Sequence, residues 1–99
     1  MEAWAVRSPA PIEKGPLVRV ERDKPVPGAH EVLVEVAACG VCRTDLHLAE
    51  GDLQPRLEGA SPGHEVVGRV VGTGEGSSRF GIGERIGIAW LRHTCGNCR

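Results

Sequence analysis

Side chains that could bind a metal or move a proton gather in two short stretches of this chain and again near residue 99. Cys42 brings a thiol to the first stretch, and His64 and Glu65 bring an imidazole and a carboxylate to the second. Zinc accepts all three donor types in proteins. The residues whose side chains could bind a metal or transfer a proton are Cys42, Thr44, Asp45, His47, His64, Glu65, Cys95 and Cys98. Together they indicate a zinc site with additional groups for proton handling.

A short helix must position the first of these groups. Residues 42–50 contain no Gly or Pro and are followed by Gly51, which predicts a helix that begins near Cys42. At a helix N-terminus the dipole favours a thiolate. Asp45 could accept the second N–H of a ligating imidazole, or it could simply be an exposed acid near the helix start. The alternative interpretation of Cys42 and His64 is a buried small residue and a capping side chain.

Thr44 and His47 lie three positions apart on the predicted helix and therefore share one face. A hydroxyl and an imidazole on one face can pass a proton outward from a metal-bound hydroxyl. The competing interpretation is a solvated helix surface without chemical function.

Two Cys-x-x-Cys pairs, Cys39 with Cys42 and Cys95 with Cys98, give the ligand count of a four-thiolate zinc ribbon. The segment between the pairs is much longer than the roughly 15–20 residues of such modules. A ribbon would also leave the histidine and the carboxylate of the second stretch unused. The sequence therefore favours two separate metal-binding groups over one ribbon.

The remaining chain is predicted to form short strands. Alternating apolar and polar residues indicate strands at 17–21 and 31–37, and β-branched valines indicate one at 64–71. Further strands are predicted at 2–7 and 84–90. Fourteen glycines and seven prolines favour turns between them. Short strands with a single clear helix predict a mainly-β barrel or sandwich, and 99 residues predict one domain. The valines of segments 31–37 and 64–71 should enter one core.

The composition excludes several classes of function. Twelve basic and 13 acidic residues give a net charge of −1, with no run of like charge, so we expect neither a nucleic-acid partner nor an anionic membrane partner. No signal peptide and no apolar run of about 20 residues is visible. The expected location is the cytoplasm, where four cysteines would be free thiols or metal ligands.

Four motifs occur together in a characteristic order. They are Gly40-Val41-Cys42-Arg43-Thr44-Asp45-Leu46-His47, Gly63-His64-Glu65-Val66-Val67-Gly68, Gly83-Glu84-Arg85-Ile86-Gly87 and Cys95-Gly96-Asn97-Cys98. In this combination the chain resembles the N-terminal part of a zinc-dependent medium-chain alcohol dehydrogenase of the bacterial and yeast-type branch. The resemblance covers residues from near 30 to the end. It implies a GroES-like β-barrel with one or two short helices, and residues 1–99 would be the N-terminal part of the catalytic domain.

The resemblance implies the ligands of a catalytic zinc ion. Cys42 and His64 would be two of its three protein ligands, and Glu65 would bind it transiently when substrate is absent. Asp45 would orient His64. Zinc lowers the pKa of an alcohol hydroxyl, and the hydride passes to a nicotinamide cofactor, NAD or NADP.

The resemblance also assigns roles around this zinc ion. Thr44 would take the alcohol proton, which passes through the cofactor ribose to His47. Arg43 would contact the cofactor pyrophosphate. Leu53 and Trp90 would line the substrate pocket, which should suit small to medium apolar primary alcohols or their aldehydes.

Cys95 and Cys98 would be the first two of four thiolates on a structural zinc ion, with His93 as a further candidate ligand. The third catalytic ligand, the last two structural thiolates and the Rossmann domain are not among residues 1–99. We therefore expect a chain truncated inside the structural-zinc loop and inactive alone, from an enzyme that is a homodimer or homotetramer. The alternatives are a related polyol, threonine or formaldehyde dehydrogenase, or a non-catalytic GroES-like zinc-binding module.

Overall fold

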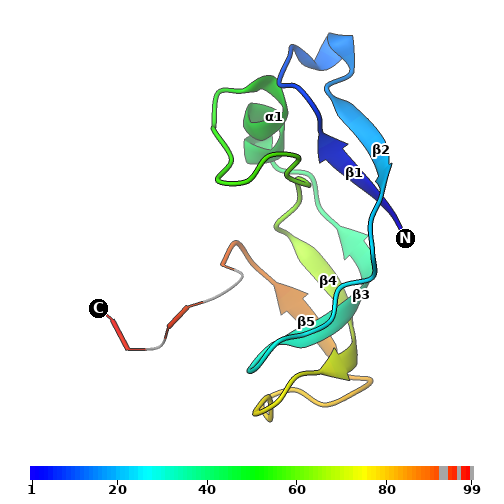
Figure 1. Ribbon diagram of the computed structural model, residues 1–99, viewed down its shortest axis with the longest axis vertical. Helices are drawn as coiled ribbons and strands as arrows, with labels where there is room; N and C mark the ends of the chain where they lie inside the picture. The colour runs from blue at the N-terminus through cyan, green and yellow to red at the C-terminus, as the bar shows by residue number, and fades with distance from the viewer. Residues whose placement is uncertain (92–93, 96, 99) are drawn as a thin grey trace. The chain divides into compact units, whose positions relative to one another are not determined.

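The computed structural model of the chain describes residues 1–91, 94–95 and 97–98. Its regular elements are mostly strands, with one α-helix and one short 3-10 turn, η1, among the described residues. In chain order they are β1 (Glu2–Val6), η1 (Ile12–Lys14), β2 (Leu17–Glu21), β3 (Val32–Cys39), α1 (Arg43–Glu50), β4 (Val66–Thr73) and β5 (Arg85–Ile88), as Figure 1 shows. The predicted mainly-β class with one or two short helices is confirmed. No helix in these residues is long and apolar enough to cross a membrane.

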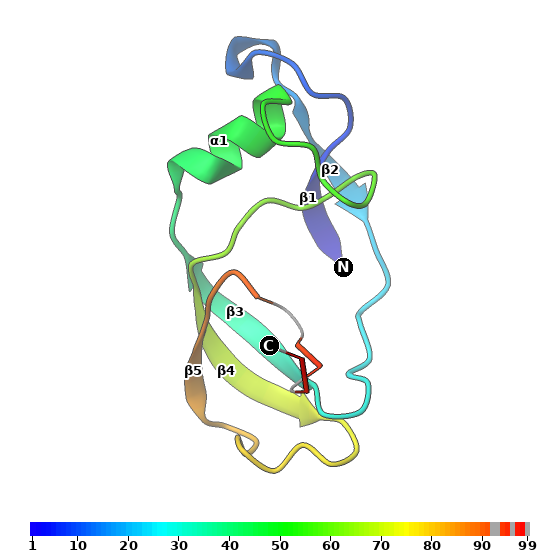
Figure 2. The same ribbon diagram turned by 90° about the vertical axis from the view of Figure 1, so that its left-hand side faces the viewer.

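The described chain forms two compact units. The first unit contains Met1–Pro25 and Val41–Gly63, and the second contains Val26–Gly40 and the described residues from His64 onward. After β3 the chain enters α1 and the loop that follows, and it then returns to β4 (Figure 2). The candidate site residues Cys42, His64 and Glu65 thus flank the places where the chain leaves and re-enters the second unit.

The first unit is built on an antiparallel pair of strands, in which β1 pairs with β2 from Glu2↔Glu21 to Val6↔Leu17. Ala5, Val6 and Ala49, each at most 4% exposed, are buried in this unit. Ala49 lies on α1, and its carbonyl accepts a hydrogen bond from the backbone N–H of Ala10 at 3.2 Å. This bond and the burial of Ala49 fix the helix against the N-terminal segment.

The second unit is a three-stranded antiparallel sheet with the order β3-β4-β5. Along β4, buried and exposed residues alternate around the fully buried Val70. Val34 lies opposite Val70, so the two valine-rich segments pair with each other. That their valines share one core stays a prediction, since Val70 is buried but Val36 and Val67 are 57% and 44% exposed. A strand is expected from residue 64, but β4 begins at Val66. Residues 64 and 65 follow the loop after α1 and lie before the first residue of β4 that pairs with β3.

Candidate metal centre

Cys42 occupies the N-cap position of α1, with an extended backbone at φ −112° and ψ 155°. The helix begins at Arg43, one residue later than the sequence predicted, and ends at Glu50 before Gly51 as expected. The Cys42 sulfur lies 3.7 Å from Thr44 Oγ1. The unpaired N–H groups and the dipole of a helix N-terminus favour negative charge at this position.

Asp45 holds two backbone segments with one carboxylate. Its Oδ2 accepts a hydrogen bond from the Cys42 N–H at 2.9 Å, and its Oδ1 accepts one from the Gly63 N–H at 3.0 Å. Gly63 immediately precedes His64. Asp45 therefore fixes the backbone at Cys42 and next to His64 at the same time. Its predicted effect on the His64 ring stays a prediction.

Gly40 makes room for the Glu65 carboxylate. Its N–H donates to the Glu65 carbonyl at 2.9 Å. A Cβ atom at this position would lie 2.7 Å from Glu65 Oε2 and 3.3 Å from Glu65 Cβ, closer than ordinary packing allows. Gly40 opens the first motif, but its sequence position alone did not indicate this role.

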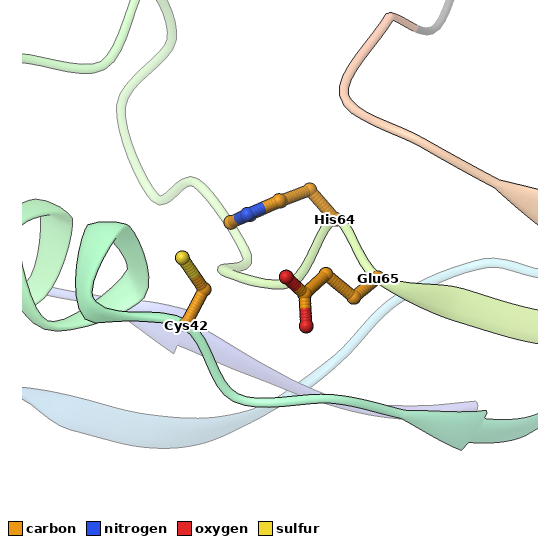
Figure 3. Close-up of side chains that lie close together, drawn as sticks. All are labelled: Cys42, His64 and Glu65. Carbon is orange, nitrogen blue, oxygen red and sulfur yellow. The ribbon is translucent and has the colours of Figure 1, made fainter.

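The structure brings three potential metal ligands together. One donor atom from each of Cys42, His64 and Glu65 lies within 4.8 Å of the other two, and Figure 3 shows the side chains directed toward one another. Donors of a tetrahedral zinc ion lie about 3.3–3.8 Å apart, given bond lengths of roughly 2.0–2.3 Å. A thiolate, an imidazole and a carboxylate are donor types that zinc binds, and here they lie no more than about 1 Å farther apart than the donors of such a site.

Trp90 packs against the imidazole of this group. Its ring centroid lies 4.8 Å from that of His64, and the ring planes meet at 60°. Trp90 is 59% exposed, so most of the indole remains available to other molecules. Leu53 is 41% exposed in the loop after α1. That Trp90 and Leu53 line one substrate pocket stays a prediction.

His47 lies on α1 and faces a carboxylate that the sequence analysis missed. Its Nδ1 atom is 3.1 Å from Asp52 Oδ2. The available signal was Gly51, since a helix that ends at a glycine commonly folds the next residues back on its last turn. Arg43 is exposed at the first position of α1, and its predicted contact with the cofactor stays a prediction.

The two cysteines near the end of the chain are close to each other. Their sulfur atoms lie 3.0 Å apart as free thiols, and the Cys98 N–H donates to Cys95 Sγ at 3.3 Å. Hydrogen bonds from the Cys98 thiol and from the backbone of Asn97 and Cys98 lower the pKa of Cys95 to about 7. A thiolate is the form that binds zinc, so the pair suits metal binding. His93, the further candidate ligand, lies outside the described residues.

The sequence profile of the alcohol dehydrogenase GroES-like domain matches residues 28–99. The chain belongs to this alcohol dehydrogenase family. It is 54% identical over 104 residues to probable alcohol dehydrogenase AdhA of Mycobacterium tuberculosis (strain CDC 1551 / Oshkosh), a match that covers 100% of this chain and 30% of that protein.

Further members of the alcohol dehydrogenase family are also similar. An alcohol dehydrogenase of Geobacillus stearothermophilus is 47% identical over 87 residues, which cover 86% of this chain and 26% of that protein. The solved structure of zinc-dependent alcohol dehydrogenase 2 from Streptococcus pneumonia superposes with a TM-score of 0.83 at 34% identity, covering 99% of this chain and 27% of that one. The chain thus spans between a quarter and a third of the length of these relatives.

Proposed function

We propose that the protein containing this chain is a zinc-dependent alcohol dehydrogenase that transfers hydride between a primary alcohol or aldehyde and NAD or NADP. The observation that carries the proposal is the convergence of Cys42, His64 and Glu65 in a member of the alcohol dehydrogenase family. Residues 1–99 supply the N-terminal part of the catalytic domain. The third catalytic zinc ligand and the nucleotide-binding domain come from other parts of the protein.

When bound, zinc supplies a Lewis acid for the alcohol oxygen and the nicotinamide supplies the hydride acceptor. Within this chain, Cys42 and His64 would hold the metal, with Glu65 binding it when substrate is absent, and Asp45 holds the backbone at Cys42 and next to His64. Thr44 takes the alcohol proton, a role supported by the position of its hydroxyl 3.7 Å from the Cys42 sulfur. His47 then passes the proton to solvent.

Trp90 limits the size of the substrate. Its indole packs on His64 and is more than half exposed, so a substrate at the metal would meet it. Leu53 is smaller and leaves space for a medium-sized apolar alcohol. Arg43 is exposed and positively charged, which suits contact with the cofactor pyrophosphate.

Cys95 and Cys98 supply two thiolates to a separate structural zinc site. Such a site has four protein ligands in total. Their sulfur atoms are already adjacent, and the lowered pKa of Cys95 favours the binding form. In this proposal the enzyme is a cytoplasmic homodimer or homotetramer whose partners are small alcohols and aldehydes, without nucleic acid or membrane.

The proposal is tested on the full protein purified with zinc. Primary alcohols should reduce NAD or NADP, and Cys42→Ala should remove one zinc ion per subunit and lower kcat/KM by at least about 100-fold. Cys39→Ala is the matched control, because this exposed cysteine lies outside the ligand group. Full activity and full zinc content in Cys42→Ala would refute the proposed site.

The substrate panel separates the alternatives. A preference for polyols, for threonine or for formaldehyde would assign the protein to a related zinc dehydrogenase. Stoichiometric zinc binding without turnover of any of these substrates would assign it to a non-catalytic GroES-like module.

A further inference from the structure

A carboxylate follows α1 and faces the side chain of His47. Asp52 Oδ2 lies 3.1 Å from His47 Nδ1, within hydrogen-bonding distance. Both side chains remain accessible, at 44% for His47 and 64% for Asp52. Both residues belong to the same compact unit and are separated by less than two helical turns of chain.

The backbone holds Asp52 in this position. The His47 carbonyl oxygen accepts hydrogen bonds from three successive N–H groups, those of Gly51 at 3.1 Å, Asp52 at 3.0 Å and Leu53 at 3.3 Å. The chain can fold back so tightly because Gly51 adopts a left-handed conformation with φ +91°. The Asp52 backbone is therefore anchored to the same residue that its side chain contacts.

This contact determines which ring nitrogen of His47 carries the proton. An ionised carboxylate can only accept hydrogen bonds, so Nδ1 must donate. In the neutral ring Nε2 is then left with its lone pair, ready to receive a proton. Without the carboxylate, the neutral ring would distribute between its two tautomers.

We infer that Asp52 is a positioning residue for the reaction: it holds the His47 ring in the tautomer and orientation in which Nε2 accepts the proton released from the alcohol. The inference rests on the proposed function, because it needs His47 to be the proton acceptor. Asp52 itself touches neither substrate nor cofactor in this role. An exposed pair of this kind shifts an equilibrium by up to about five-fold, which sets the size of the expected effects.

The experiment combines spectroscopy with kinetics on the zinc-loaded full protein. Nitrogen NMR of ¹⁵N-histidine-labelled protein reports the tautomer of His47, with His47→Gln used to assign its signal. Asp52→Ala removes the carboxylate, and Asp52→Asn removes the charge but keeps an acceptor oxygen. Asp23→Ala is the matched control, since Asp23 is an exposed aspartate in the same unit.

We expect the wild type to show His47 protonated at Nδ1. Asp52→Ala should shift the tautomer ratio toward Nε2–H by about two- to five-fold and lower kcat by a similar factor, with the KM for alcohol unchanged. Asp52→Asn should lie between, and Asp23→Ala should match the wild type. An unchanged tautomer ratio in both Asp52 variants would overturn the inference, whatever the activity.

Two further outcomes separate this inference from the proposed function. A shifted tautomer ratio with unchanged kcat in the Asp52 variants would overturn the positioning role while leaving the dehydrogenase assignment intact. Full activity of His47→Gln would overturn both the positioning role and the part of the proposed function that makes His47 the proton acceptor. Lack of dehydrogenase activity in the wild type would overturn the proposed function and, with it, the positioning role of Asp52 in the reaction.

Discussion

Replacing Asp45 by Asn should weaken both the fold and the metal site. The Asp45 carboxylate accepts one hydrogen bond from Cys42 and one from Gly63, at 2.9 Å and 3.0 Å. An asparagine has one acceptor oxygen and one NH₂ group, so one of these two N–H groups would face another donor. The substitution therefore removes one hydrogen bond and the charge that strengthens the other.

The size of the effect follows from these two bonds. A hydrogen bond to a charged group contributes about 1.5–3 kcal/mol, and an N–H left without an acceptor adds to its loss. Because the site is only partly buried, we expect Asp45→Asn to lower the free energy of unfolding by about 1–3 kcal/mol. Groups that orient metal ligands typically affect metal affinity by about 10–100-fold, so the zinc dissociation constant should rise by a comparable factor.

The assay is urea unfolding with and without chelator, together with zinc titration. In chelator the loss of stability should already be present, because the two hydrogen bonds do not require metal. Asp23→Asn is the control with the same change of charge at an exposed position. A loss below about 0.5 kcal/mol in chelator would show that the two hydrogen bonds do not hold this part of the fold.

The other predictions concern the second cysteine pair, the glycine beside Glu65 and the indole that packs on His64. Cys98→Ala should raise the pKa of Cys95 from about 7 toward its ordinary value of 9.0, because the Cys98 hydrogen bond that stabilises the thiolate is lost. In zinc-free protein, the midpoint of the pH profile for alkylation of Cys95 should therefore move upward, and an unmoved midpoint would contradict the assignment. Gly40→Ala should push the Glu65 carboxylate aside and weaken zinc binding about ten-fold while changing the free energy of unfolding by less than about 1 kcal/mol; unchanged zinc affinity would show that the carboxylate is not used. Trp90→Ala should raise kcat/KM for branched alcohols relative to ethanol, and a constant ratio would remove Trp90 from the pocket.

Local patterns were sufficient to predict most of the secondary structure. The alternation of residues 17–21 predicted β2 with its bounds, and Gly51 predicted the end of α1. The position of Cys42 at the helix start followed from the same short segment. These features depend on neighbours in sequence, whose spacing is visible without a structure.

Other features depend on contacts between distant residues or on backbone detail. The role of Gly40 in making room for Glu65 could not be derived from the first motif alone, because that contact arises only after the strands have paired. The edge-on packing of Trp90 on His64 likewise joins residues far apart in the chain. To predict the carboxylate next to His47, one would have to know how the chain turns after Gly51.

The long connection between β3 and β4 has a consequence for the order of folding. Cys39 pairs with Val66, so this antiparallel pair is not closed by the two- to five-residue turn of an ordinary hairpin. The chain must lose the entropy of closing the large loop before the pairing contributes, which slows folding. Cys42 and His64 lie just inside the two ends of that loop. In our proposal, an ion shared by them ties off a loop of about twenty residues, which would disfavour the unfolded chain by about 3 kcal/mol if it acts like a covalent cross-link. Bound metal would then shorten the loop that the chain has to close, so β3 and β4 should pair faster in the presence of zinc than in its absence.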